Sequence, residues 1–369
     1  MRRKVLATGG GGYIGSHVAV ALLEAGYDVV ILDNFENSDP SVIDRIEYLS
    51  KHNVTLVQGD VRNRATLDDI FRHHHVDAVI HLAGKKAVGE SLSNPLLYFQ
   101  DNVLGAVTLL QAMQAAGVNR LVFSSSATVY GVPERLPVDE TCRTGVTNPY
   151  GRSKLIVEEI LDDCVAADSD LTVVSLRYFN PVGAHCSHLI GENPQGIPSN
   201  LLPYVAQTAL GQRPFVQVFG SDYDTPDGTG LRDYIHVVDL AAGHLAAINF
   251  ILTAVQTCNS HRRINLGTGK GHTVLEVIAA FSRACGFAVP YRVVPRRPGD
   301  TAASIADASL ARKLLGWQAK LGLDQMCADQ WAFVSTAAQR REPERAYHQN
   351  SPTLNINLLQ KKLPEFGTS

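Results

Sequence analysis

The sequence contains no apolar run that approaches the roughly 20 residues needed for a membrane-spanning helix. It also lacks an excess of positive charge, since 33 Lys and Arg residues stand against 36 Asp and Glu residues, which gives a net charge of −3. Binding to nucleic acid or to an anionic membrane surface normally needs a basic patch. We therefore expect neither a nucleic acid nor a membrane as a partner.

Paired cysteine motifs are absent as well. The six cysteines form no C-x-x-C pair; they are Cys142, Cys164, Cys186, Cys258, Cys285 and Cys327. Cysteines scattered over a chain of this length indicate reduced, mostly buried thiols, and no metal site is expected. A secretory leader is not indicated, because the basic residues 2–4 are followed by a short stretch and then by glycines. We expect a cytoplasmic protein.

The length and composition indicate a globular protein with a substantial core. The chain has 369 residues, of which 45% are hydrophobic and 19% are charged. At about 150 residues per domain, this length suits two to three domains, or one large domain with an attached lobe.

Short β-branched runs alternate with helical stretches in the first half of the chain. The expected strands are residues 5–8, 28–32, 54–57, 78–82, 120–123 and 172–176, and an expected helix covers 14–25. These runs are apolar on both faces, as in a parallel sheet covered by helices. The alternation predicts a doubly wound α/β fold with a parallel sheet.

The pattern changes after about Asn180, where Pro and Gly cluster and the regular alternation is lost. We predict a first domain over residues 1–180 and a smaller lobe over 181–345. Residues 264–266 resemble a strand that returns to the sheet, so the lobe would be partly interleaved with it. Residues 346–369 form a polar tail, which is either disordered or an addition to the natural chain.

A glycine-rich segment lies between the first expected strand and the first expected helix. Gly9, Gly12 and Gly15 have the spacing G-x-x-G-x-x-G. Such a turn lets the backbone approach a pyrophosphate, and the helix N-terminus offers free N–H groups and a positive dipole end. The strand before it and the helix after it are the context that a dinucleotide site needs. The alternative is a purely structural turn.

Two carboxylates follow the next strands. Asp33 ends the second strand, 18 residues after Gly15, where it would accept hydrogen bonds from the adenosine ribose hydroxyls. A carboxylate there would repel a 2′-phosphate, and no Arg follows it directly, so NAD is favoured over NADP. Asp60 follows the third strand and is placed to meet the adenine edge. Its alternative role is a helix N-cap.

Tyr150 and Lys154 form the pattern Y-x-x-x-K, which places both side chains on one face of a helix. The pKa of Tyr is ordinarily about 10, so a nearby ammonium and a cationic nicotinamide would be needed to favour the phenolate. Ser126 follows the fifth strand, at the end of the sheet where ligands bind. It can hydrogen-bond the same substrate hydroxyl that Tyr150 deprotonates. The pattern Y-x-x-x-K is common by chance, but its combination with Ser126 and the glycine segment is not.

These residues together resemble the extended short-chain dehydrogenase/reductase superfamily, and within it the UDP-glucose 4-epimerase family. The resemblance runs from about Lys4 to about Trp331. The closest local matches are residues 8–17, 83–91, 123–131, 176–185, 228–237 and 295–307.

The resemblance implies a role for each matching residue. Tyr150 would be the base for the sugar 4-hydroxyl, assisted by Ser126, and Lys154 would hold the nicotinamide ribose and tune Tyr150. The implied NAD site of the Rossmann domain also contains Gly9, Gly12, Tyr13, Ile14, Gly15, Asp33, Asn34, Asp60, Val61, Leu82, Ala83, Gly84, Lys86, Asn102 and Phe179. The implied UDP-sugar site in the lobe contains Asn180, Asn200, Leu201, Phe219, Arg232, Arg297, Asp300 and Ser304. An arginine suits a diphosphate as a charge-assisted donor, but either one alone is as well explained by a surface salt bridge.

The implied reaction is the reversible interconversion of UDP-glucose and UDP-galactose through a 4-keto sugar, with tightly bound NAD regenerated in each turnover. The resemblance also implies a homodimer, in which the helices at residues 94–116 and 153–167 form a four-helix interface.

Two positions depart from the family pattern. Members specific for glucose and galactose carry a bulky Tyr where this chain has Ser304. The smaller side chain would leave room for a C2 acetamido group, which predicts additional activity on UDP-GlcNAc and UDP-GalNAc. The alternative is that neighbouring side chains fill the space. Lys85 is the second departure, since related chains often have an apolar residue there.

Other functions fit the sequence less well. A sugar-nucleotide 4,6-dehydratase would need an Asp-Glu pair after the Ser, where this chain has Ala127 and Thr128. A UDP-glucuronate decarboxylase would need a charged setting that is not evident. A non-catalytic NAD-binding protein would have no reason to keep Ser126, Tyr150 and Lys154 together.

Overall fold

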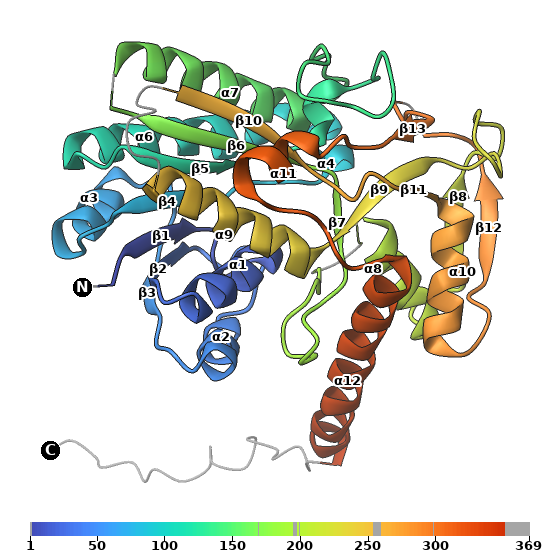
Figure 1. Cartoon of the computed structure of the whole chain (residues 1–369). Coiled ribbons are helices and arrows are strands. Elements are labelled where there is room, and N and C mark those ends of the chain that lie inside the picture. The colour runs from blue at the N-terminus through green and yellow to red at the C-terminus, as the bar shows by residue number, and fades with distance from the viewer. Residues whose placement is uncertain are drawn as a thin grey trace, which may run out of the picture.

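A parallel sheet of seven strands forms the centre of the molecule (Figure 1). The computed structural model describes residues 2–168, 170–194, 198, 200–253, 260–297 and 299–350. The sheet has the strand order β10-β6-β5-β4-β1-β2-β3. Its strands are β1 (Lys4–Thr8), β2 (Asp28–Asp33), β3 (Thr55–Gln58), β4 (Ala78–His81), β5 (Arg120–Ser124), β6 (Thr172–Tyr178) and β10 (Ser260–Leu266). The predicted doubly wound fold is confirmed. The predicted return of residues 264–266 is confirmed too, because β10 pairs with β6 in parallel.

Helices cover both faces of this sheet. One face carries α1 (Tyr13–Glu24), α2 (Val42–Ser50), α9 (Val237–Thr253) and α11 (Ser309–Leu315); the other carries α3 (Arg64–His73), α6 (Gly105–Ala116) and α7 (Pro149–Ala167). Strand β1 shows why both faces are apolar. Val5 and Ala7 pack into the core beneath α1 and α9, whereas Leu6 packs into the core beneath α3 and α6, and all three are fully buried.

The connection from β4 to β5 is more broken than the helix expected at residues 94–116. It consists of α4 (Val88–Ser93), α5 (Pro95–Tyr98), a π-helical turn η1 (Phe99–Leu104) and then α6. Within the π-helical turn, the buried Asn102 side chain bonds to the backbone of Lys85 and to the hydroxyl of Ser153. The wide turn is therefore located at a residue that supports the loop after β4, as π-helical segments at functional sites often are.

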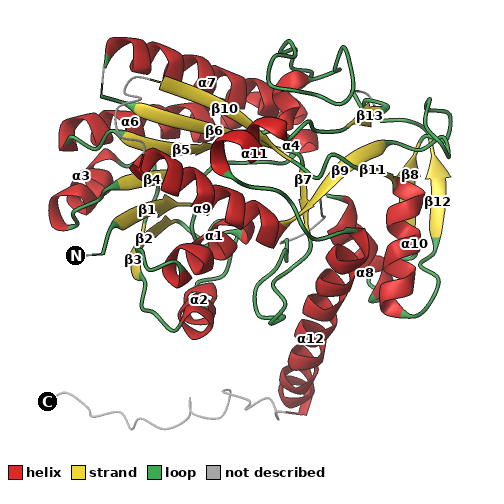
Figure 2. Ribbon diagram, viewed as in Figure 1, coloured by secondary structure: helices red, strands yellow, loops and turns green. Residues whose placement is uncertain are grey.

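The smaller lobe is built from short strands and helices (Figure 2). Its elements are β7 (Asn180–Val182), α8 (Leu201–Ala209), β8 (Val216–Phe219), β9 (Leu231–His236), β11 (Gly271–Thr273), α10 (Val274–Cys285), β12 (Tyr291–Val294), β13 (Ala303–Ser304) and α12 (Leu323–Asn350). Helices α8, α10 and α12 share one apolar core. Since α9, β10 and α11 belong to the central sheet unit, the two units interleave along the chain.

The polar tail expected from residue 346 has a different start. Helix α12 continues to Asn350, so the first residues of that segment extend the helix, and residues 351–369 lie outside the described part of the chain. No helix among the described residues is long and apolar enough to cross a membrane.

The cysteines are less buried than the sequence suggested. Of the five in the described residues, all carry free thiols, but only Cys142 and Cys327 are buried, and Cys186 is exposed. Cys258 lies outside the described residues.

Three buried histidines should make the fold sensitive to acid. Burial lowers the pKa of His17 and of His81 to about 3 and that of His244 to about 4, from the ordinary value of 6.5. The unfolded chain therefore binds more protons below pH 6.5, so stability that is fully present above this pH is lost as the pH falls. Between pH 7.5 and 5.0 we expect each histidine to reduce the free energy of unfolding by about 2 kcal/mol.

Urea unfolding across this pH range would measure the loss. The slope of the unfolding free energy against pH is proportional to the number of protons taken up on unfolding. His244→Gln should reduce this number by about one, whatever its effect on absolute stability. His75→Gln, at an exposed position, is the matched control and should leave the slope unchanged. Equal unfolding free energies at pH 7.5 and 5.0 in the unsubstituted protein would contradict the prediction.

Candidate active site

The glycine segment forms a tight cradle at the carboxyl end of β1. A Cβ on Gly9, whose φ is +71°, would lie 2.6 Å from the Ala83 nitrogen, and a Cβ on Gly15 would lie 2.1 Å from the Gly9 carbonyl oxygen. Helix α1 begins directly after Gly12, which offers no side-chain cap to the first N–H groups of the helix. These donors and the helix dipole suit a pyrophosphate that rests on the backbone, so the segment fits a dinucleotide.

Asp33 closes the neighbouring side of the cradle. Its Oδ2 accepts a hydrogen bond of 2.9 Å from the Gly11 N–H, and its Oδ1 accepts one of 2.8 Å from the Phe35 N–H. Burial raises the pKa of Asp33, although both backbone hydrogen bonds oppose this shift. The carboxylate thus helps to shape the loop, and each oxygen keeps a lone pair for the hydroxyls of a ribose.

Asp60 is held by Arg62, not by a helix terminus. The Arg62 guanidinium donates to both of its oxygens, at 2.9 and 2.6 Å, and Asn34 donates to it at 3.3 Å. The hydrogen bonds from Arg62 lower the pKa of Asp60 to about 2. The N-cap of α3 is Asn63, so the alternative reading of Asp60 as that cap is wrong.

Tyr150, Lys154 and Ser126 come together between β5 and α7. Lys154 Nζ donates a hydrogen bond of 2.9 Å to the Ser124 carbonyl, and the Ser126 side chain is near enough to Tyr150 to lower the pKa of its hydroxyl. Ser126 Oγ also accepts from the Thr128 hydroxyl at 3.0 Å. The hydroxyl at the end of β5 and the Tyr–Lys pair on α7 are therefore neighbours in the structure.

The protein's own groups do not by themselves favour the phenolate of Tyr150. Burial raises the pKa of its hydroxyl above the usual value, and the nearby Ser126 side chain opposes this shift. Burial also lowers the pKa of the Lys154 ammonium to about 8. The protein's own groups thus leave Tyr150 protonated near neutral pH, because desolvation outweighs the effect of Ser126.

One cavity of about 1400 Å³ connects the glycine cradle with this tyrosine–lysine pair. Most residues of the expected NAD site line it: Gly9, Gly12, Tyr13, Ile14, Gly15, Asp33, Asn34, Asp60, Val61, Leu82, Ala83, Gly84, Lys86, Tyr150 and Lys154. Ser126, Phe179 and Asn102 do not line it. Asn102 instead supports the loop at Lys85 from behind, as described above.

The expected UDP-sugar residues lie mainly in the lobe, and of these expected residues only Asn200 lines the same cavity. Ser304 of β13 pairs in register with Arg232 of β9, and Asn180 of β7 pairs with Tyr234 of the same strand. At the end of β8, the Arg297 guanidinium lies 4.6 Å from the centre of the Phe219 ring. Arg297 Nε also donates to Asp300 at 3.0 Å, and Leu201 opens α8 directly after Asn200.

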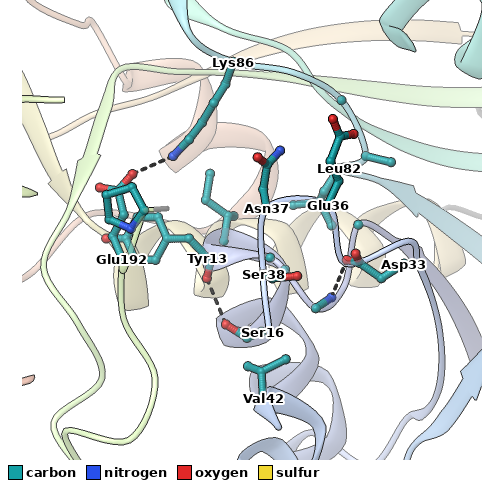
Figure 3. A pocket seen from close by; sticks show the side chains of 18 of the residues that line it. Tyr13, Ser16, Asp33, Glu36, Asn37, Ser38, Val42, Leu82, Lys86 and Glu192 are labelled. Atoms are coloured by element: carbon teal, nitrogen blue, oxygen red, sulfur yellow. Dashed lines mark hydrogen bonds and ion pairs between the residues drawn. The ribbon is translucent and has the colours of Figure 1, made fainter. Parts of the chain in front are cut away.

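Glu192 is a site residue that the sequence analysis missed. Its Oε1 forms an ion pair of 2.6 Å with Lys86 Nζ (Figure 3) and accepts a hydrogen bond of 3.0 Å from Asn200 Nδ2. Its Oε2 is buried and has no hydrogen-bond partner among the residues that the structure describes. Because the side chain is only 6% exposed and lines the cavity, it joins the expected NAD residue Lys86 to the expected substrate residue Asn200. No motif in the sequence marks this glutamate.

Known proteins match this sequence over most of its length. The family model described as GDP-mannose 4,6 dehydratase matches residues 6–330. A Bacillus subtilis UDP-glucose 4-epimerase is 50% identical over 332 residues, which cover 90% of this chain and 97% of that one.

Solved structures agree with these matches. UDP-glucose 4-epimerase from Bifidobacterium longum, in complex with NAD+ and UDP, is 50% identical with a TM-score of 0.87, covering 91% of this chain and 99% of that one. The enzyme from Stenotrophomonas maltophila, with bound NAD and formylated UDP-arabinopyranose, is 52% identical with a TM-score of 0.89, covering 92% and 100%.

The family model carries the name of a dehydratase, but the residues after Ser126 are Ala127 and Thr128, and neither is an acid. The whole-chain relatives with half of their residues identical are epimerases. On the cradle, the Ser–Tyr–Lys group and these relatives together, the chain belongs to the UDP-glucose 4-epimerase family of NAD-dependent isomerases.

Proposed function

We propose that this protein interconverts UDP-glucose and UDP-galactose by inverting C4 of the sugar, with NAD as a bound cofactor. The observation that carries the proposal is the single cavity that holds both the glycine cradle and the Tyr150–Lys154 pair. A site with a dinucleotide cradle and a tyrosine base suits removal of hydrogen from a secondary alcohol. The inversion follows when that hydrogen returns to the other face of the same carbon.

In this reaction, Tyr150 takes the proton from the O4 hydroxyl as a phenolate, a form that the positive charges of Lys154 and of a bound nicotinamide would favour, and later returns it. Ser126 forms a hydrogen bond with the same O4 hydroxyl of the sugar and keeps this hydroxyl directed at Tyr150. When bound, NAD would supply the acceptor, and afterwards the donor, of the C4 hydride. Lys154, fixed by the Ser124 carbonyl, holds a positive charge beside the tyrosine and the ribose.

The sugar must rotate within the site between the two halves of the reaction, so that its other face meets the cofactor. We place the nucleotide in the lobe, where Arg232 and Arg297 supply charge for the diphosphate and Asp300 accepts from the ribose diol. A firmly held nucleotide keeps the 4-keto sugar in the site, whereas a loosely contacted hexose is free to rotate. Uniformly tight binding of the sugar would oppose that rotation.

The test of the function uses purified protein without added cofactor. Incubation with UDP-galactose should yield UDP-glucose, and denaturation of the protein should release NAD. Absence of product, even after NAD is added, would contradict the proposal.

The small side chain of Ser304 supports a wider substrate range that includes UDP-GlcNAc and UDP-GalNAc. Ser304 is half-buried on β13 and pairs with Arg232, the residue that we assign to the diphosphate, so we expect a larger residue there to occupy space needed by the sugar. We expect Ser304→Tyr to reduce turnover of UDP-GalNAc by about 100-fold, since a ring cannot share the space of an acetamido group. Turnover of UDP-galactose should stay within about threefold of the unsubstituted enzyme, because that sugar lacks the acetamido group.

Parallel chromatography of both reactions gives the ratio directly. Ser309→Tyr, at the start of α11 and outside the proposed site, is a control for adding a phenol to this region. If the unsubstituted protein turns over UDP-galactose but gives no product from UDP-GalNAc, the wider range is wrong and the 4-epimerase proposal stands.

We also propose a homodimer in the cytoplasm. Val88, Leu92, Leu96 and Leu104 are exposed on the segment from α4 to η1, next to α7, and would be covered by a second copy. Light scattering should then give twice the 40.0 kDa mass of one chain. The free thiols of the described cysteines suit a reducing compartment.

A further inference from the structure

Five side chains of alternating charge form a connected series along the wall of the cavity. In order they are Asp60, Arg62, Asp101, Lys85 and Glu36, and all five line the cavity. The first three are joined by Arg62, which contacts both Asp60 and Asp101. The last three are joined by Lys85, whose Nζ lies 2.6 Å from Glu36 Oε1 and 3.7 Å from Asp101 Oδ2.

The pair of Lys85 and Glu36 joins two loops that lie on opposite sides of β1. Lys85 lies in the loop after β4, and Glu36 lies in the loop after β2. Since the strand order is β4-β1-β2, a bond between these loops has to cross the carboxyl end of β1. The glycine cradle begins at that end, with Gly9. The ion pair thus bridges the two sides of the dinucleotide cradle.

The backbone of Lys85 is held in place by Asn102. Its backbone N–H donates to Asn102 Oδ1 at 2.8 Å, and its carbonyl accepts from Asn102 Nδ2 at 3.1 Å. Only the side chain is left to be ordered when the bridge forms. Lys85 and Asp101 side chains are each only 11% exposed, whereas Glu36 is 52% exposed. Burial opposes the charge on Lys85, but its carboxylate partners outweigh burial and raise its pKa.

Most isolated surface ion pairs contribute little, because water screens them and long side chains lose freedom. This pair differs, since its cation is largely withdrawn from water and has two carboxylate partners. An apolar side chain at position 85 would leave Glu36 without its partner and the loops without their bridge.

We propose that the Lys85–Glu36 ion pair is a clasp over the dinucleotide cradle, and that it slows the release of NAD. The inference rests on the proposed function, in which NAD stays bound from one turnover to the next. The cofactor accepts and returns a hydride within one turnover, so the reaction does not require bound NAD to exchange with NAD in solution. Slow release of NAD therefore suits the reaction. Lys85 and Glu36 are positioning residues in this proposal and take no part in the chemistry.

The rate of NAD release tests the clasp. Protein loaded with radiolabelled NAD is mixed with excess unlabelled NAD, and retained label is followed by rapid gel filtration. Lys85→Met keeps an unbranched side chain that is one atom shorter and removes its charge, and we expect release about 10-fold faster. Glu36→Gln should accelerate release less, because Asp101 still pairs with Lys85. The double variant should release NAD at the rate of Lys85→Met, since both substitutions break the same bridge.

Salt and a matched control separate the clasp from general weakening. Raising the salt concentration should accelerate release from the unsubstituted protein and have little effect on Lys85→Met, because the screened charge is gone. Arg72→Met removes an exposed ion pair with Asp69 on α3 and should leave the rate unchanged.

An unchanged rate of NAD release from both Lys85→Met and Glu36→Gln would overturn the clasp. The proposed function would still stand if these proteins contained NAD and had epimerase activity. Glu36→Gln, at an exposed side chain, provides the result if Lys85→Met does not fold. A protein that neither carries NAD nor turns over UDP-galactose would instead refute the proposed function, and the clasp with it.

Discussion

Tyr150→Phe is expected to lower kcat for UDP-galactose by about 10³-fold. The substitution removes one hydroxyl, which we assign as the group that takes and returns the O4 proton. Positioned acid–base groups typically contribute 10²- to 10⁴-fold, and here the same group acts in both halves of the reaction. The ring, which packs edge-on against Tyr98 with centroids 6.4 Å apart, is retained.

Binding should survive this substitution. The substitution changes only the hydroxyl beside Ser126, and the cradle that would hold the dinucleotide is untouched. NAD released on denaturation and the dissociation constant for UDP should therefore match the unsubstituted protein. Steady-state kinetics together with these two binding measurements separate a chemical defect from a binding defect.

Tyr48→Phe is the matched control, because Tyr48 is 63% exposed on α2 and lies outside the cavity. It should leave kcat unchanged. A Tyr150→Phe enzyme that keeps more than about a tenth of the original kcat would show that another group carries the proton.

Gly15→Ala should have the second large effect, a loss of NAD affinity of at least about 100-fold. The added Cβ would lie 2.1 Å from the Gly9 carbonyl oxygen and 2.7 Å from Gly10 Cα. Both are backbone atoms, so the clash cannot be relieved by turning a side chain. Either α1 or the glycine loop must move, and the N–H donors then no longer converge on one anion. A 100-fold loss corresponds to about 2.7 kcal/mol.

The sign of this effect is informative, because Ala in a helix is otherwise more favourable than Gly by about 1 kcal/mol. Gly322→Ala is the control, since nothing lies within 4 Å of the Cβ that it adds. The affinity is measured by titrating NAD-free protein with NAD and following tryptophan or cofactor fluorescence. A Gly15→Ala protein that binds NAD with unchanged affinity would refute the assignment of residues 9–15 as the cradle.

Features that depend on neighbouring residues were accessible from the sequence. The glycine spacing, the Y-x-x-x-K helix and the six β-branched strands are each local patterns, and the structure places the strands at the expected positions. The return of β10 to the sheet was also indicated, by a short apolar run after an irregular region.

Features that depend on long-range contacts were not accessible. Lys86 and Glu192 are 106 positions apart in the chain, so no motif joins them, yet they form an ion pair of 2.6 Å. Lys85 stood out as a departure from the family, but its partner Glu36 became evident only once the loops after β2 and β4 were placed on either side of β1. Similarly, the raised pKa of Tyr150 reflects burial, which a spacing argument does not measure.

The sequence by itself determined the doubly wound fold, the dinucleotide cradle and the Tyr150–Lys154 pair, because hydrophobic period and local spacing specify them. Tertiary structure alone decided how charges meet across the cavity, how Asn102 supports the loop after β4, and how burial sets the pKa values of the site. The physical reason is that backbone conformation is governed largely by near neighbours, whereas electrostatics and desolvation depend on what packing brings together in space.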